Sequence, residues 1–197
     1  MHAKLLHAEG KTKEALEIYT TKFSDLYCTC GQKCEQLFDK DTEEYYYHLE
    51  KNMYELANFA ADKFGRTVFF NPSLSMEEKA ECTMHYSKLM LNAFEETNEV
   101  FFLVLARALL SRMENDLLFR GGTDEQVIAV MDKNLYVTKK LAEQAKNNKA
   151  LRVALYKGES LFERELQNRI EAQDGRPAEL LKNAAYAEVL NKYKLSF

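Results

Sequence analysis

The chain has 197 residues, 46% of them hydrophobic, with a formal net charge of −4 and a pI of about 5.7. This is enough apolar material for one large domain or two small ones, and the small negative charge indicates neither a nucleic acid nor a membrane surface as partner. With only 2 Pro and 7 Gly, the composition favours long helices over many short strands.

The first forty or so residues predict a helical hairpin. A short apolar-rich segment ends at Gly10, and Thr12 is a plausible N-cap for a second helix that runs to about Tyr27. Ala15 and Tyr19 lie four residues apart on the apolar face of that helix.

The next expected helix runs from about 42 to 64, and Gly65 is a typical C-terminal stop. The stretch 67–70 is briefly β-prone and leads into a turn at Asn71 and Pro72. Ser75 and Glu78 fit a capping box, which predicts a helix from there to about residue 98.

The most apolar helix is expected over 97–119, ending at the Gly121–Gly122 pair. It is interrupted by Arg107 and Arg112, whereas a membrane span needs roughly 18 or more residues with few charges, so we interpret it as a buried core helix.

Three further helices are predicted in the last third of the chain. Thr123 caps one that reaches the Asn147–Asn148 pair, and helical periodicity resumes over 150–172. Pro177 is predicted at the first position of a final helix over 178–195. We therefore expect a single all-α domain over 1–197, with long-helix hairpins over 41–197 packed antiparallel.

The segment from Ala3 to Tyr19 resembles a tetratricopeptide (TPR) hairpin. Ala3 matches the small residue of the first helix, Gly10 the turn, Ala15 the close-packing alanine and Tyr19 the aromatic residue of the second helix. The match covers only about 22 residues of the hairpin assigned to 1–40, and no regular repeat follows it. The resemblance is therefore to a divergent, short TPR-like superhelix, and a compact α-helical bundle is the alternative.

This resemblance implies a non-enzymatic module that binds a protein or a peptide. In bacteria, TPR-like domains of this size often follow a helix-turn-helix DNA-binding head, which implies a sensor domain of a transcriptional regulator, with nucleic acid bound only through a missing or separate domain. Because the match begins inside the first helix, Leu5 and Leu6 lack a preceding helix to pack on, so we expect a homodimer or an upstream segment.

The cysteines Cys28, Cys30 and Cys34 form the sharpest local cluster. Zinc sites usually pair two such ligands with a second pair, which is absent here, so we expect no metal and no cofactor, with this cluster as the weaker alternative. No secretory signal pattern is present, so we expect reduced thiols and a cytoplasmic location.

Arg107, Tyr47 and Tyr54 are the candidate ligand-binding residues. Tyr47 and Tyr54 share a helical stripe and suit an interface. Arg107 is expected to be mostly buried and paired with a carboxylate from a neighbouring helix, so that its replacement by Ala costs about 3 kcal/mol if that carboxylate is left alone. Its functional interpretation is a groove residue that holds a ligand carboxylate.

Two charged regions are interpreted as solvated surface rather than as sites. The first contains carboxylates that could pair, namely Glu95, Glu96, Glu99, Glu114 and Asp116. The second is basic and comprises Lys139, Lys140, Lys146, Lys149, Arg152 and Lys157. No catalytic motif is found, so the second function class that we consider is a small-molecule- or metal-binding bundle, ahead of an enzyme.

Overall fold

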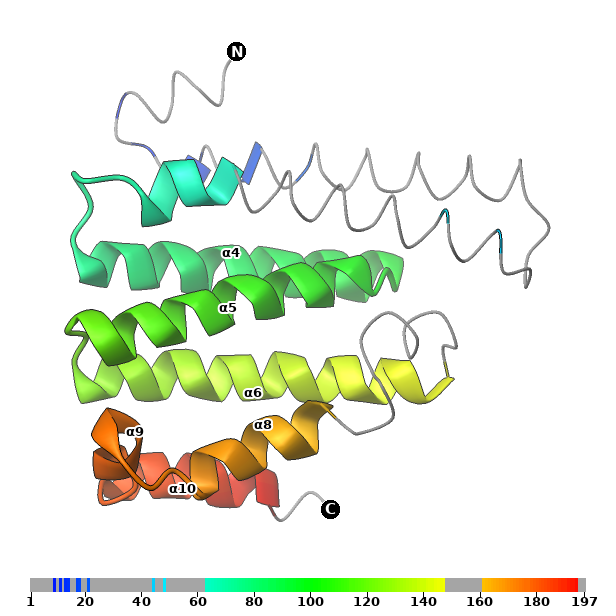
Figure 1. The fold of residues 1–197 in the computed structure, drawn as a ribbon. Helices are drawn as coiled ribbons and strands as arrows, with labels where there is room; N and C mark the ends of the chain where they lie inside the picture. The colour runs from blue at the N-terminus through cyan, green and yellow to red at the C-terminus, as the bar shows by residue number, and fades with distance from the viewer. Residues whose placement is uncertain are drawn as a thin grey trace.

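The computed structural model describes residues 63–147 and 161–194, together with positions 9, 11, 13, 14, 17, 18, 21, 44 and 48. Within these residues all regular structure is helical and there is no strand, which confirms the predicted all-α fold (Figure 1). The predicted hairpin over 1–40 lies almost wholly outside this part of the chain, so its TPR-like identity stays a prediction.

The described fold consists of seven helical elements, of which three are long. The elements are η1 (Gly65–Phe69), α4 (Met76–Thr97), α5 (Phe101–Arg120), α6 (Asp124–Asn147), α8 (Leu161–Ile170), α9 (Gly175–Leu180) and α10 (Ala184–Lys194). The three longest, α4, α5 and α6, contain 22, 20 and 24 residues, as expected for long-helix hairpins.

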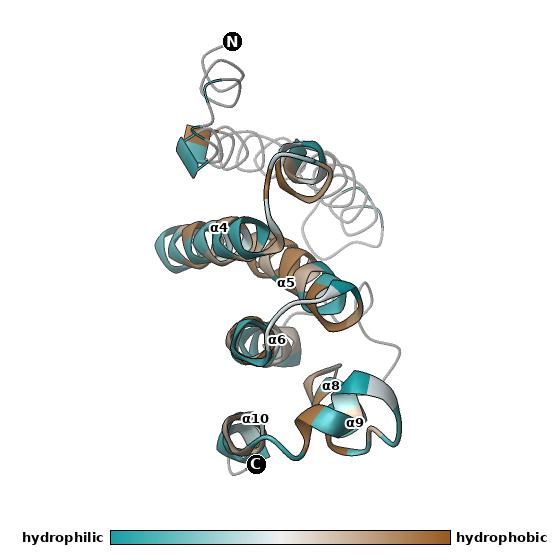
Figure 2. Ribbon diagram, turned by 90° about the vertical axis from the view of Figure 1, so that its left-hand side faces the viewer, coloured by the Kyte–Doolittle hydropathy of each residue, from teal (hydrophilic) through white to brown (hydrophobic). Residues whose placement is uncertain are grey.

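These helices stack in two layers. α4, α5 and α6 follow one another antiparallel through short turns (Figure 1). Viewed nearly end-on, α4, α6 and α10 form one side of the stack, whereas α5, α8 and α9 form the other (Figure 2). α6 is the central element, because it packs against α4, α5, α8 and α10.

The core is centred on α5, which confirms that the most apolar helix is buried. Side chains on more than half of the circumference of α5 are inaccessible to solvent, including Phe101, Phe102, Leu105, Leu110, Met113 and Leu117. Each fully buried side chain of this size contributes about 1.5–3 kcal/mol of hydrophobic stabilisation.

The predicted helix starts at Ser75 and Thr123 are confirmed. The Ser75 hydroxyl accepts from the Glu78 backbone N–H at 3.2 Å, and the Glu78 carboxylate accepts from the Ser75 N–H at 2.7 Å. Thr123 and Gln126 make the same reciprocal pair at 3.3 and 2.9 Å. Each pair satisfies two backbone donors that a helix start otherwise leaves unbonded.

The prediction that Gly65 ends a helix, and that 67–70 is β-prone, was wrong. The helical path continues through Gly65 into a π-helical turn, in which the Phe70 N–H donates to the Gly65 carbonyl at 2.8 Å. Tertiary packing overrides the local preference, because Phe64 and Val68 are buried and Phe64 contacts the rings of Phe69 and Tyr86.

Two other boundaries differ from the prediction. α5 begins at Phe101 because Asn98 adopts a left-handed conformation (φ 57°) after α4. The final helix predicted over 178–195 is two helices, α9 and α10, separated by a turn over 181–183. Pro177 is the third residue of α9 rather than the first, since Asp174 is the N-cap.

Candidate functional site

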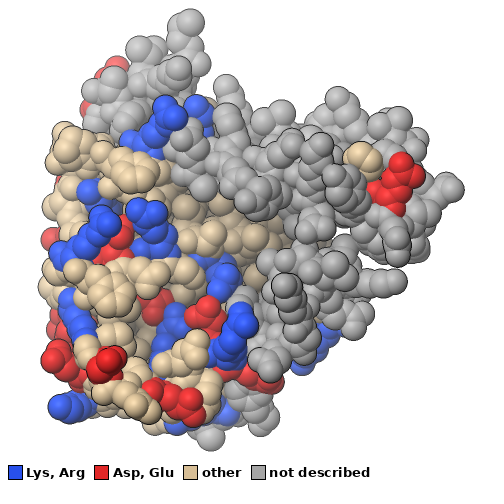
Figure 3. Space-filling model, in the orientation of Figure 1, with Lys and Arg blue, Asp and Glu red and all other residues tan. Residues whose placement is uncertain are grey.

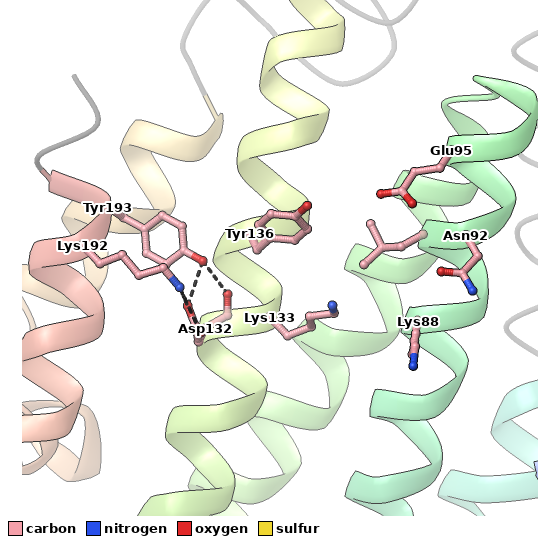
Figure 4. Close-up of a pocket in the computed structure, with 9 residues that line it drawn as sticks. Lys88, Asn92, Glu95, Asp132, Lys133, Tyr136, Lys192 and Tyr193 are labelled. Atoms are coloured by element: carbon pink, nitrogen blue, oxygen red, sulfur yellow. Dashed lines mark hydrogen bonds and ion pairs between the residues drawn. The ribbon is translucent and has the colours of Figure 1, made fainter.

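A groove runs across the layer formed by α4, α6 and α10 (Figure 4). Its volume is about 370 Å³, within the usual range for ligand pockets. Residues from all three helices line it: Lys88, Leu91, Asn92, Glu95, Asp132, Lys133, Tyr136, Lys192 and Tyr193.

Asp132 of α6 bonds to α10 and so joins the two helices on one side of the groove. Its carboxylate pairs with the Lys192 amine at 2.8 and 3.2 Å and accepts a hydrogen bond from the Tyr193 hydroxyl at 2.8 Å (Figure 4). The Tyr193 hydroxyl also donates to the Asp132 backbone carbonyl at 2.9 Å. Burial, followed by the bond to Asp132, raises the pKa of Tyr193 well above its usual range, so this phenol stays protonated and keeps donating.

The floor of the groove carries a tyrosine between two lysines of the same helix. The amines of Lys133 and Lys140 lie 5.4 and 5.3 Å from the centre of the Tyr136 ring, at cation–π distance. Tyr136 is 38% exposed. Lys133 extends from α6 toward α4, and Glu95 extends from α4 toward α6 (Figure 4).

The pKa of Lys133 is lower than that of an ordinary lysine. Burial is the largest cause, and Lys88 lowers the pKa further, whereas Asp132 and Glu95 partly oppose the shift. Among the described residues, the amines of Lys88 and Lys133 form no ion pair. The groove therefore presents a partly desolvated cation without a carboxylate bonded to it.

A buried ion-pair network lies on the other side of α6. Glu114 of α5 is 5% exposed, and its carboxylate accepts two hydrogen bonds from Arg169 of α8, at 3.0 and 2.8 Å. It accepts a third from Asn134 of α6, at 2.7 Å. The interpretation of Glu114 as a solvated carboxylate was therefore wrong: three donors on two other helices compensate for its burial.

Arg107, the arginine singled out from the sequence, belongs to the same network. Its Nη2 donates to Glu165 of α8 at 2.8 Å, which confirms the predicted pairing with a neighbouring helix. The side chain is 23% exposed, and its Nε is buried without a hydrogen-bond partner. Burial would raise the pKa of Glu165, but Arg169 and then Arg107 outweigh it and lower that pKa. Arg107 thus joins α5 to α8 and does not line the groove.

The other residues predicted for a site lie outside the described residues. These are Tyr47, Tyr54, Cys28, Cys30 and Cys34. The described cysteine, Cys82, is buried with a free thiol. Within the described part of the chain, no group of three or more His, Cys, Asp or Glu side chains is placed to hold a metal ion. No helix there is both long and apolar enough to cross a membrane.

Exposed aromatic side chains also occur outside the groove. Phe70 and Phe119 are 70% and 73% exposed. Arg112 lies 5.4 and 5.8 Å from the ring centres of Phe69 and Phe70, and it pairs with Asp116 at 3.5 Å. Positive and negative side chains are interspersed over the face that Figure 3 shows, so the part of it that is described carries no extended field of one sign.

Sequence reasoning missed the groove, because its residues come from three helices up to about 100 positions apart in the chain. One signal was available: Lys133, Tyr136 and Lys140 share a helix face by their spacing. Lys140 was instead grouped with the basic region interpreted as solvated surface. Comparison with models of protein families, with curated proteins and with solved structures finds no match.

Proposed function

We propose that this chain is a non-enzymatic interaction module that binds a segment of another protein in the groove across α4, α6 and α10. The observation that carries the proposal is the groove itself, which offers an exposed tyrosine and two amines, of Lys88 and Lys133, that form no ion pair within the described part of the chain. Tyrosine supplies a large contact area at a low cost in conformational entropy, and it is enriched where proteins bind one another.

The groove is built on elements that are already held in place. Asp132 is bonded to Lys192 and Tyr193, so the distance between α6 and α10 is set before any ligand arrives. On the opposite side of α6, Asn134 is bonded to Glu114 and so ties α6 to α5. A surface ordered in advance loses less entropy on binding, which supports a recognition role.

The alternative from the sequence, a small-molecule- or metal-binding bundle, has less support. The Arg107 guanidinium is engaged by Glu165, and the cysteine cluster lies outside the described residues. We keep the sensor domain of a cytoplasmic regulator as the proposed biological setting, on the TPR-like resemblance alone.

A second copy of the chain is a second candidate partner. Exposed phenylalanines are uncommon on the free surface of a protein, and Phe70 and Phe119 are both exposed outside the groove. This observation supports a homodimer through Phe70 and Phe119, which is a different surface from the N-terminal hairpin on which the homodimer was predicted.

Selection from a random peptide library displayed on phage tests the proposal. The full chain and its Tyr136→Ala variant are used as parallel baits, with far-ultraviolet circular dichroism confirming that both are helical. We expect peptides that enrich on the wild type and lose binding to the variant. Enrichment of the same peptides on both baits, or of none on either, would contradict the proposal.

A further inference from the structure

The charges in the groove differ in how far they are already neutralised. Lys192 and Asp132 form an ion pair at 2.8 Å, and the Tyr193 hydroxyl donates a hydrogen bond to the same carboxylate. Lys88 and Lys133 remain without an ion pair among the described residues, and Glu95 is the remaining acid in the lining. The uncompensated charge of the groove is therefore positive, between α4 and α6.

Lys133 is the groove lysine whose charged form is disfavoured by partial burial when no ligand is bound. It is less exposed to water than a surface lysine, and burial disfavours its charged form. Its amine also lies over the ring of Tyr136, which restrains it more than free solvent would. An anion placed beside this amine would restore the interactions that the amine loses on leaving water.

Neutral donors stand beside these amines. Tyr136 and Asn92 both line the groove from opposite walls, and a phenol and an amide can each donate to an oxygen. Two amines, a phenol and an amide form a donor set that suits a carboxylate and the peptide groups next to it.

A polyanion fits the groove less well than a few carboxylates do. Glu95 and Asp132 lie in the lining, and the whole chain carries a formal net charge of −4. A nucleic acid brings a closely spaced row of phosphates, which these charges would repel.

We propose that the ligand of this groove is an acidic protein segment, one carboxylate of which lies between Lys88 of α4 and Lys133 of α6, beside Tyr136. This inference rests on the proposed function and adds the chemical class of the ligand. Lys140, on the far side of the Tyr136 ring, provides a second positive charge for a neighbouring acidic residue of the same segment.

The test uses the full chain and the groove-dependent peptides, which are those that bind the wild type and lose binding to Tyr136→Ala. We expect these peptides to be enriched in Asp and Glu, and the enrichment to disappear when the bait is Lys133→Glu. Groove-dependent peptides without acidic bias would overturn the inference and leave the proposed function standing. A lack of groove-dependent peptides would contradict both.

Affinity measurements on one enriched peptide test the position of the carboxylate. Lys133→Met keeps the aliphatic length and removes the charge, and we expect it to weaken binding roughly 10- to 100-fold. Lys146→Met is the matched control on α6: Lys146 is exposed and does not line the groove, so we expect no change. Replacing the critical Asp or Glu of the peptide with Asn or Gln should reproduce the loss on wild type and add nothing on Lys133→Met.

Salt dependence and a nucleic-acid probe complete the test. Raising the salt from about 0.05 M to about 0.5 M should weaken peptide binding to wild type more than to Lys133→Met. Equal effects of Lys133→Met and Lys146→Met would overturn the inference. So would tight binding of a single-stranded oligonucleotide that is lost in Lys133→Met, since it would identify phosphate as the ligand.

Discussion

At the scale of single residues, Arg169 of α8 is the centre of the buried ion-pair network that joins α8 to α5. It donates two hydrogen bonds to the buried carboxylate of Glu114, and a third to Glu165, at 2.7 Å. Arg107 reaches only Glu165, which Arg169 already holds. The two arginines therefore differ in what remains unpaired when each is removed.

We predict that Arg169→Ala lowers the free energy of unfolding by about 3–5 kcal/mol, because it leaves Glu114 buried with one partner side chain, Asn134. Arg107→Ala should cost only about 1 kcal/mol, less than the sequence suggested, because Glu165 keeps Arg169. Urea unfolding of the two variants measures both values.

The double variant Glu114→Leu, Arg169→Met is the control and should be close to wild type. Equal losses for Arg107→Ala and Arg169→Ala would contradict this account.

The buried Tyr186 makes the free energy of unfolding depend on pH in alkaline solution. Burial raises the pKa of Tyr186 from 10.0 to about 12; Arg169 opposes the shift and Glu114 adds to it. The folded state therefore holds the phenol proton more tightly than the unfolded state does. The stabilisation is fully present below pH 10 and is lost as the pH rises toward 12, by about 1.4 kcal/mol for each pH unit. Urea unfolding between about pH 9 and about pH 11 should show a shallower loss in Tyr186→Phe than in wild type. The same slope in both proteins would mean that Tyr186 titrates normally.

At the scale of elements, the turn between α5 and α6 shows what local sequence can predict. Gly121 adopts φ 103°, a conformation that favours glycine, so the sequence correctly placed the end of α5 there. The sequence does not reveal that Arg176 of α9 donates at 3.1 Å to the Leu117 carbonyl, which already accepts from the Gly122 N–H at 2.9 Å. That contact depends on a helix more than fifty residues away.

We predict that Gly122→Ala is more harmful than Gly121→Ala, although only Gly121 has a positive φ. A Cβ on Gly122 would lie 2.8 Å from the Leu117 Cβ and 3.1 Å from its Cα, so the backbone must shift, whereas a Cβ on Gly121 meets nothing within 4 Å. We expect a loss of about 1–3 kcal/mol for Gly122→Ala and of about 1 kcal/mol for Gly121→Ala. Thermal unfolding of both variants measures the order, and the reverse order would show that backbone strain at Gly121 dominates.

The same contrast explains which parts of the fold and site could be predicted. Ser75 with Glu78 and Thr123 with Gln126 are local signals, because each pair closes within three residues. The π-turn at Gly65 depends on Phe64 packing against Tyr86, and the burial of Glu114 depends on Arg169. The groove is the extreme case, since Asp132, Lys192 and Lys88 meet only after three helices have packed.

At the scale of the whole molecule, the described stack has two different faces. One layer, α4, α6 and α10, carries the polar groove (Figure 2), and the exposed Phe70 and Phe119 do not line that groove. Phe119 is seven residues from Arg112 on α5, so the two share one face of that helix about 10 Å apart. Arg112 in turn lies over Phe70. We call Phe70, Arg112 and Phe119 together the Phe70–Phe119 patch.

We predict that the chain self-associates through this patch. Multi-angle light scattering of wild type over a range of concentrations should show a dimer, and replacing both Phe70 and Phe119 with Ser should shift it to monomer. Tyr136→Ala is the matched control, since it removes an aromatic side chain from the groove face and should leave the oligomeric state unchanged. A wild-type monomer at every concentration would rule the prediction out.

The central claim is that the groove across α4, α6 and α10 is the binding face. Backbone amide chemical shifts of the full chain, recorded during titration with an enriched acidic peptide, test it most directly. The account predicts saturable shifts at Lys88, Asn92, Lys133, Tyr136 and Lys192, lost in Lys133→Met, with little change near Phe70 and Phe119. Shifts centred on the Phe70–Phe119 patch or around Arg107, with the groove unchanged, would contradict it.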